Sequence, residues 1–243
     1  ARRCGVGTRQ GAEVAHQVGV FVNPTLRNAA AHVVVDDLAA PRLDETDAHH
    51  LFRVLRLREG AVVTATDGRG SWRECRVRGR DAIGVHGDII TESARALPLG
   101  VAFVPVKAEK PENTIRQLVE VGVDEIFVIS PTKRAVAGTR DRLNDRSERI
   151  VREACMQSRR VFLPAVHLGV PLADVAALGG VAVADPDGVA PSTAHRLLIV
   201  GPEGGFDDGE IPASVARVNI GPAVLRAETA ALVAGARLVG LHA

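Results

Sequence analysis

The chain has few aromatic residues. Phenylalanine, tryptophan and tyrosine together make up 3% of its 243 residues, with one tryptophan and no tyrosine. Domains that bind single-stranded nucleic acid by base stacking need several aromatic side chains on one surface. The composition therefore disfavours a stacking platform. Any binding of nucleic acid is expected to depend on phosphate contacts and on the shape of the partner.

Cysteine is also scarce, and long apolar runs are missing. The three cysteines, Cys4, Cys75 and Cys155, contain no CxxC pair, so neither a zinc site nor a disulfide framework is indicated. No apolar stretch approaches the roughly eighteen residues of a membrane-spanning helix, and no signal peptide is recognised at the start. We expect a cytoplasmic protein with no metal and no membrane partner, in which Cys155 packs in the core.

The formal net charge of +1 conceals a separation of sign along the chain. Residues 53–80 hold eight arginines against three acids, and residues 133–160 hold nine basic residues against four acids. Residues 161–224 hold two arginines against seven acids. Clustered arginines suit a polyanion, because a guanidinium can bind two phosphate oxygens at once. Solvated helix faces rich in arginine explain the same pattern equally well.

The first part of the chain predicts a short extension followed by a small β domain. Residues 1–19 lack periodicity and are expected to be poorly ordered. Residues 20–92 contain short β-like runs separated by turns such as DGRG, which predicts a small β-barrel or sandwich. One segment, TDAHHLFRVLRLREG, has a helical period, with Leu51, Val54 and Leu55 on one face. Residues 93–98 are the expected linker.

Beyond the linker, residues 99–243 alternate between strand and helix patterns, which predicts a parallel α/β domain. Strands are expected at 99–106, 124–130, 180–185, 196–201 and 217–221. Helices are expected at 111–122, 142–159, 207–216 and 226–241, with Pro111 in the first turn and Gly122 after the last turn of the first of these helices.

Two glycine-containing turns follow two of these strands. LLIVGPEGGF carries three glycines and a carboxylate, Glu203, that looks buried in the sequence pattern, and Gly221-Pro222 repeats Gly201-Pro202 twenty positions later. Neither turn has the GK[ST] of a P-loop or the spacing of GxGxxG, and Glu203 would repel a phosphate. Because open α/β sheets bind ligands at the carboxyl ends of their strands, the paired turns predict a site for an uncharged, edge-rich group such as adenine.

At these residues the chain resembles a known family. LLIVGPEGGF, IGPAVLRAETAAL, KPENTIRQLVEVGVDEIFVISPTKRAV and REACMQSRR are similar to the RsmE-type ribosomal RNA methyltransferases of the SPOUT superfamily, and HHLFRVLRLREG resembles their PUA-like RNA-binding domain. The resemblance spans residues 20–242. It implies an α/β domain with a deep trefoil knot, preceded by a PUA-like β-barrel, and a homodimer that uses S-adenosylmethionine to methylate N3 of a uridine in 16S rRNA of the small ribosomal subunit.

The resemblance also implies a cofactor site built from both turns. Glycines permit close approach of the backbone, and apolar side chains enclose a purine. Ala184, at the end of another strand, is expected to complete the wall. The residues assigned to the cofactor are Ala184, Val200, Gly201, Glu203, Gly204, Gly205, Ile220, Gly221, Val224, Leu225 and Ala230.

Arg226, Arg160 and Glu228 are the expected catalytic residues. Arg226 opens the last expected helix, where the helix dipole disfavours a cation, so contact with the substrate's phosphate or uracil oxygens is favoured. Arg160 is expected to assist it in stabilising charge on the uracil as N3 loses its proton. Glu228 sits in the first turn, where an acid stabilises a helix in any case.

Another set of residues is expected to bind RNA, by position and by resemblance: Arg53, Arg56, Lys110, Arg134, Arg152, Gln157 and Arg159.

Methyl transfer from a sulfonium is an in-line displacement in which the enzyme mainly positions the reactants, and the target base must be unpaired or flipped. Three alternatives remain: a related methyltransferase that acts on tRNA or another rRNA site, a non-catalytic RNA-binding assembly factor, and a nucleotide-dependent oxidoreductase, against which the missing GxGxxG counts.

Overall fold

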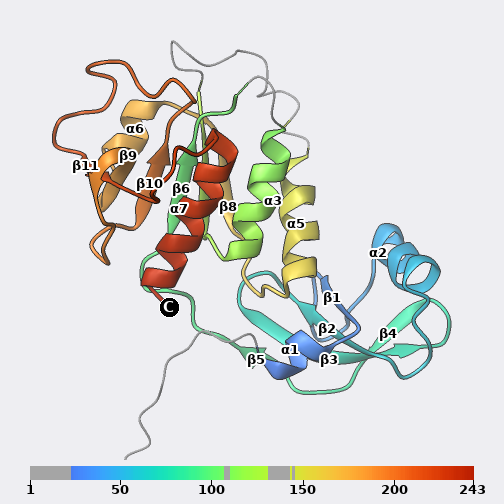
Figure 1. The fold of residues 1–243 in the computed structure, drawn as a ribbon. Coiled ribbons are helices and arrows are strands. Elements are labelled where there is room, and N and C mark those ends of the chain that lie inside the picture. The colour runs from blue at the N-terminus through green and yellow to red at the C-terminus, as the bar shows by residue number, and fades with distance from the viewer. Residues whose placement is uncertain (1–22, 107–109, 131–142, 144–145) are drawn as a thin grey trace, which may run out of the picture.

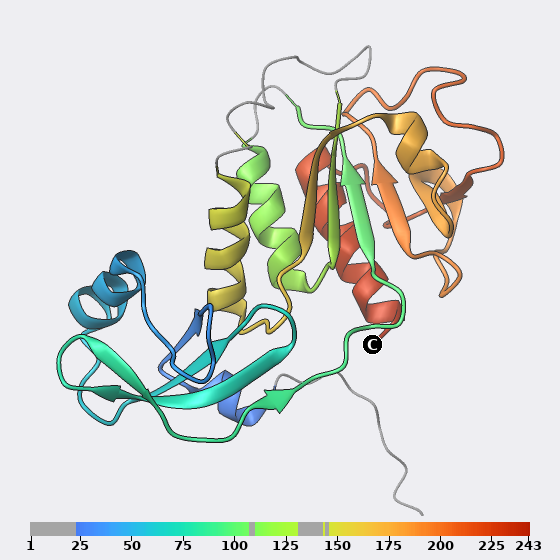
Figure 2. The ribbon, with the colours of Figure 1, turned by 180° about the vertical axis from the view of Figure 1, so that it is seen from behind.

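The computed structural model describes residues 23–106, 110–130, 143 and 146–243 (Figure 1). The expected extension at 1–19 and the predicted RNA-binding residue Arg134 lie outside this described part. The chain builds a small β unit and a larger α/β unit, which confirms the predicted fold class (Figures 1 and 2). The trefoil knot implied by the resemblance stays a prediction.

The β unit is a five-stranded sheet that follows a short helix, α1 (Pro24–Asn28). Its strands are β1 (Ala31–Val34), β2 (Val62–Thr66), β3 (Ser71–Arg78), β4 (Ala82–Val85) and β5 (Ile90–Thr91). The order is β1-β2-β3-β4, with β5 pairing with β3. Alternate residues such as Val33, Val63 and Val77 are fully buried and form the core of this unit.

The helical segment of the β unit differs from its prediction. It forms an α-helix, α2 (Glu45–His49), that continues as a π-helical turn, η1 (His50–Val54), in which the Leu55 amide donates to the His50 carbonyl at 2.9 Å. The wider turn removes the expected common face. Leu51 is buried, whereas Val54 and Leu55 are exposed.

The α/β unit is built on a parallel sheet of six strands in the order β11-β9-β10-β6-β7-β8. The central strands β6 (Gly100–Phe103), β7 (Glu125–Ile129) and β10 (Leu197–Val200) are apolar and largely buried, as expected for a sheet covered on both faces. The other strands are β8 (Ala165–Val170), β9 (Val181–Val189) and β11 (Ala216–Val218).

Helices cover the two faces of this sheet unequally. On one face α3 (Pro111–Val121), α5 (Ser147–Ser158) and α7 (Ala227–Leu241) pack over β6, β7 and β10 (Figure 1). The short helix α6 (Leu172–Ala176) lies on the other face (Figure 2). Gly122, at φ 99°, ends α3 as predicted, because a left-handed residue closes the last turn.

Three elements of the α/β unit were not predicted correctly. The expected helix at 207–216 is wrong: these residues form turns, with Gly209 at φ 81° and Pro212 interrupting any helical path, and β11 already begins at Ala216. Strand β8 and helix α6 were missed. Gly169, at φ 66°, interrupts the alternation by which β8 would have been recognised.

The two units are joined where the β unit packs against α5 and the segment that follows it. Arg152 on α5 donates to the Val34 carbonyl at 2.8 Å and pairs with Asp47 at 2.5 Å. Arg159 donates to the Ala29 carbonyl at 3.0 Å. These two arginines therefore hold the units together, and their expected role in RNA binding stays a prediction.

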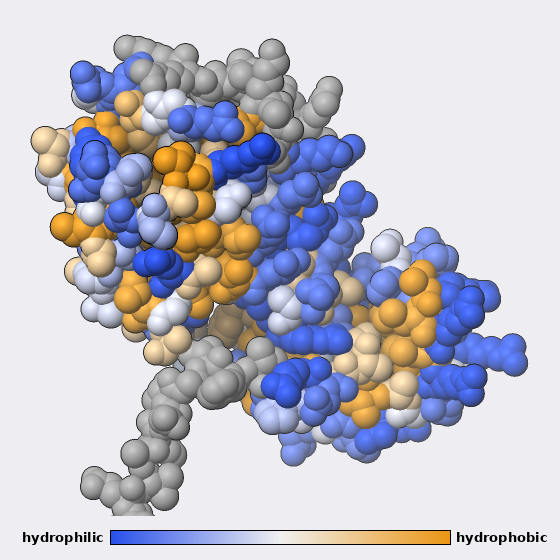
Figure 3. Space-filling model, viewed as in Figure 1, coloured by the Kyte–Doolittle hydropathy of each residue, from blue (hydrophilic) through white to orange (hydrophobic). Residues whose placement is uncertain are grey.

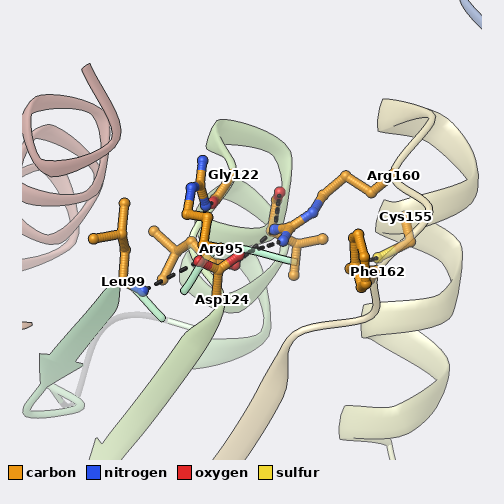
Figure 4. A network of polar contacts seen from close by, with 9 residues as sticks. Arg95, Leu99, Gly122, Asp124, Cys155, Arg160 and Phe162 are labelled. Atoms are coloured by element: carbon orange, nitrogen blue, oxygen red, sulfur yellow. Dashed lines mark hydrogen bonds and ion pairs between the residues drawn. The ribbon is translucent and has the colours of Figure 1, made fainter. Parts of the chain in front are cut away.

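Arg160 occupies the same junction, close to the amino ends of the strands (Figure 4). Its guanidinium donates to the carbonyls of Val119 and Val123 and pairs with Asp124 at 3.0 Å. Arg95, in the segment that precedes β6, pairs with the same carboxylate at 2.8 Å. The side chain of Arg160 is 14% exposed. The guanidinium therefore holds the segment after α5 against α3 and against the segment before β7.

His32 is buried within this junction and gives a pH-dependent prediction. Its ring nitrogens face the Thr64 hydroxyl at 2.8 Å and the Arg160 carbonyl at 3.1 Å. Burial lowers the pKa of His32 from 6.5 to about 4. The unfolded chain therefore binds the proton first as the pH falls, so the contribution of His32 to stability is full above pH 6.5 and is lost towards pH 4. From this pKa shift we expect a loss of about 3 kcal/mol.

Chemical denaturation of the protein and of a His32→Gln variant between pH 7 and pH 4 tests this expectation. The free energy of unfolding of the unaltered protein should fall more steeply with decreasing pH than that of the variant. Parallel pH profiles would contradict the proposed burial of a neutral imidazole.

Candidate cofactor site

A cavity of about 520 Å³ opens at the carboxyl ends of β9, β10 and β11. Its volume lies within the usual range for small-molecule sites. The wall comes from three segments: the turn after β10, the turn after β11, and residues 183–186 in the middle of β9. The position at the strand ends is the one expected for a ligand site in a parallel α/β sheet.

The turn after β10 is shaped by its glycines. A Cβ atom on Gly201 would lie 2.9 Å from the ring of Phe206, so no larger residue fits without moving that ring. Gly205 has a φ of 68°, and its amide donates to the Pro202 carbonyl at 2.8 Å. Glu203 is exposed at the cavity wall, which corrects the expectation of a buried carboxylate.

The turn after β11 supplies the apolar part of the wall. Ile220 is buried, and Leu225 packs against the core beneath α7. The Gly221 amide donates to the side-chain oxygen of Asn219 at 2.8 Å. Val224 is 93% exposed at the edge of the cavity, an unusual position for a large apolar side chain.

The structure brings all eleven residues assigned to the cofactor onto the wall of this one cavity. They are Ala184, Val200, Gly201, Glu203, Gly204, Gly205, Ile220, Gly221, Val224, Leu225 and Ala230. The expectation that the two turns follow neighbouring strands is wrong, because β9 lies between β10 and β11. Residues of β9 complete the wall between the two turns.

Sequence analysis missed a group of polar wall residues. Asp185, Arg217 and Asn219 line the cavity, and the Arg217 guanidinium donates to the Asp185 carboxylate. The hydrogen bond from the Asp187 amide and the one from Arg217 lower the pKa of Asp185, so this carboxylate is ionised. The turn signal DPDG at 185–188, which begins at the last residue of a predicted strand, is the sequence feature from which this wall could have been found.

The three expected catalytic residues do not come together. Arg226 is exposed at the start of α7, between the cavity residues Leu225 and Ala227, and Glu228 is half-buried in the first turn of the same helix. Arg160 lies at the opposite end of the sheet, bound within the protein. We therefore replace its catalytic assignment with a structural one.

The expected RNA-binding residues are spread over the described surface. Arg53 and Arg56 are exposed at the end of the π-helical turn, where Arg56 has a φ of 53°. Lys110 is exposed at the start of α3, and Gln157 is exposed on α5. Arg152 and Arg159 serve the junction described above.

The described part of the chain shows neither a metal site nor a membrane-spanning helix. Among these residues no group of three or more His, Cys, Asp or Glu side chains is arranged to hold a metal ion. None of the described helices has the length and apolar character needed to cross a bilayer. Burial raises the pKa of the Cys155 thiol to about 11, so this cysteine is a core residue as predicted.

Two protein families and a known relative match this chain. Residues 93–239 match the family described as RNA methyltransferase domain, and residues 43–90 match the RNA methyltransferase PUA domain. The ribosomal RNA small subunit methyltransferase E of Mycobacterium bovis is 31% identical, with 88% of each chain covered.

Two solved structures share the fold. A probable rRNA methyltransferase from Porphyromonas gingivalis aligns with a TM-score of 0.71 and 27% identity, covering 87% of this chain and 98% of that chain. A ribosomal RNA small subunit methyltransferase E from Neisseria gonorrhoeae, solved with S-adenosyl methionine, aligns with a TM-score of 0.71 at 23% identity over 87% and 97% of the two chains. The two domain matches and the relative that is similar over most of its length establish that the chain belongs to the RNA methyltransferase family that includes ribosomal RNA small subunit methyltransferase E.

Proposed function

We propose that this protein uses S-adenosylmethionine to methylate N3 of a uridine in the 16S rRNA of the small ribosomal subunit. The observation that carries the proposal is the cavity at the ends of β9, β10 and β11, because both glycine turns meet there. The relatives support the substrate class through their names, which specify the small subunit. Within this scheme we propose residues 20–92 as the RNA-binding unit, 93–98 as the linker and 99–243 as the methyltransferase unit.

The residues of the cavity fit the proposed cofactor. Ile220 and Leu225 offer apolar contact to a purine, and the backbone around Gly221 is open, since a Cβ atom there would meet no protein atom within 4 Å. Four carboxylates and one guanidinium line the wall: Asp185, Glu203, Asp207, Asp208 and Arg217. An acidic wall suits a cationic ligand. When bound, S-adenosylmethionine supplies a methyl group activated by a sulfonium.

Arg226 and Glu228 are the proposed catalytic residues of the chain. Their neighbours Leu225, Ala227 and Ala230 line the cavity, so both begin α7 beside the place where the methyl group would be held. Uracil N3 must lose its proton before it attacks a methyl group, and the resulting charge spreads onto O2 and O4. A guanidinium at Arg226 would stabilise that charge by hydrogen bonds that strengthen in the transition state.

We propose that RNA is held by exposed polar and cationic side chains outside the wall of the cavity. Arg53, Arg56, Lys110 and Gln157 remain proposed contacts, and Arg134 is kept from the resemblance alone. Because aromatic residues are few, phosphate contacts and RNA shape are proposed to dominate recognition. A folded ribosomal subunit presents such a shape more completely than free RNA does.

We also propose that the protein acts as a homodimer and that it acts in the cytoplasm, where ribosomal subunits are found. Apolar side chains gather on the face of the molecule that carries α7 (Figure 3). Val224, at the edge of the cavity, is almost fully exposed in the single chain. Large exposed apolar side chains beside a site favour cover by a second subunit.

The test is transfer of labelled methyl groups from S-adenosylmethionine to three RNA substrates: small ribosomal subunits from a strain that lacks uridine-N3 methylation of 16S rRNA, free 16S rRNA, and tRNA. Label in the small subunits is the expected result. Label confined to tRNA would keep the cofactor assignment and reject the substrate. Binding of S-adenosylmethionine without transfer to any RNA would favour a non-catalytic assembly factor.

A further inference from the structure

The wall that sequence analysis missed is an excursion from the sheet. Strand β11 pairs with β9 at Val183 and then again at Val189, so residues 184–188 leave the pairing between these two positions. Ala184, Asp185 and Pro186 from this excursion face the cavity. Three of the five consecutive residues that the β9–β11 ladder does not hold therefore form this wall.

Side chains from β11 and the residue that follows it hold the excursion instead. Arg217 donates to the Asp185 carboxylate, and the Asn219 side-chain amide donates to the Pro186 carbonyl at 2.6 Å. The backbone of β11 presses against the same segment, because a Cβ atom on Gly188 would lie 2.5 Å from the amide nitrogen of Val218. The excursion is therefore packed closely against β11.

Asn219 connects this wall to the turn that forms the opposite side of the cavity. Its nitrogen donates to the Pro186 carbonyl, and its oxygen accepts from the Gly221 amide at 2.8 Å. Reversing the amide would put donor against donor and acceptor against acceptor, so its orientation follows from its partners. The backbone amide of Asn219 also donates to the Val189 carbonyl at 2.7 Å, which fixes the position of the residue itself.

We propose that Asn219 is a positioning residue that holds the 184–188 wall and the 220–225 turn at the separation the cofactor requires. The proposal rests on the proposed function for the identity of the ligand. Both polar atoms of the side chain make hydrogen bonds within the protein, and it is through these bonds to Pro186 and Gly221 that Asn219 acts. A rigid, preformed site binds more tightly because less order has to be created on binding.

Two substitutions distinguish the hydrogen bond to the Pro186 carbonyl from the hydrogen bond with the Gly221 amide. Asn219→Ala removes both, and we expect the Kd for S-adenosylmethionine to rise about 10- to 100-fold, since each lost hydrogen bond costs up to about tenfold. Asn219→Asp keeps an acceptor for Gly221 but sets a carboxylate against the Pro186 carbonyl, and an increase of about tenfold is expected. Asn113→Ala, at an exposed asparagine on α3 away from the cavity, is the matched control.

The experiment has two readouts. Calorimetric titration with S-adenosylmethionine measures the Kd, and steady-state kinetics should show a raised KM for S-adenosylmethionine with an unchanged KM for RNA and a kcat within about threefold of the unaltered protein. Hydrogen exchange without ligand should speed up in peptides covering 184–189 and 220–226 of Asn219→Ala.

Three outcomes overturn the proposal: an unchanged Kd in Asn219→Ala, unchanged exchange in both peptides, or a lowered Tm with parallel increases in both KM values, which would indicate a merely structural role. The exchange readout needs no ligand. If the unaltered protein binds no S-adenosylmethionine, the proposed function fails, while the exchange rates still decide whether Asn219 holds the two walls together.

Discussion

Replacing Arg160 with alanine is expected to lower the free energy of unfolding by about 3 to 5 kcal/mol, as removal of one partner from a buried ion pair generally does. The substitution would remove the hydrogen-bond donor of the Val119 and Val123 carbonyls. It would also remove one ion-pair partner of Asp124, which among the described residues would then pair with Arg95 alone. Because the Arg160 backbone carbonyl faces His32, the loosened segment should also weaken the contact between the two units.

Urea denaturation followed by circular dichroism measures this loss. Arg149→Ala is the control, since Arg149 lies on α5, the helix that precedes Arg160, with an exposed side chain whose ion pair among the described residues is a long i,i+4 pair to Glu153 at 3.9 Å. The control should change stability by less than about 0.5 kcal/mol. An Arg160→Ala protein that is as stable as the original yet inactive would restore the catalytic assignment that the sequence suggested.

Replacing Arg226 with alanine is expected to have the opposite profile, with a turnover rate lowered by about 100-fold or more and little change in stability. Removal of one hydrogen-bond donor to a developing oxyanion typically costs about 10²- to 10³-fold in kcat. Arg226 is exposed and donates no side-chain cap to α7, so the fold does not depend on it. Its removal also relieves the unfavourable placement of a cation at a helix start.

Single-turnover methylation of small ribosomal subunits, with S-adenosylmethionine binding measured in parallel, tests this expectation. Arg226→Ala should bind S-adenosylmethionine as the original does, and Arg226→Lys should recover part of the rate by keeping the charge. Arg237→Ala, an exposed arginine further along α7, is the matched control and should be fully active. Full turnover by Arg226→Ala would remove this residue from the mechanism.

The cofactor wall was predictable from sequence to a large extent because it consists of strand ends and glycine turns. Both features are local, and a parallel sheet brings its carboxyl ends to one edge wherever the strands fall in its order. The family resemblance then assigned Gly201, Gly221 and their neighbours to the site. The 184–188 excursion was missed because its shape depends on Asn219, which is distant in sequence and carries no motif.

The role of Arg160 was not predictable in the same way. The string REACMQSRR shows that Gln157 and Arg160 share a helix end, but not at which edge of the sheet that helix ends. In the structure Arg159 adopts a left-handed conformation, with φ of 62°, and the chain then enters the junction with the β unit. The expected helix at 207–216 failed for a related reason, since positive φ at Gly205 and Gly209 lets the chain run along the cavity as turns.

The measurement that tests the account most directly is nucleoside analysis of 16S rRNA after small subunits lacking uridine-N3 methylation have reacted with the protein and S-adenosylmethionine. The expected product is one new nucleoside, 3-methyluridine, at close to one per subunit, formed about 100-fold or more slowly by Arg226→Ala under the same conditions. A ribose-methylated nucleoside, a different methylated base, or 3-methyluridine formed equally by Arg226→Ala would contradict it.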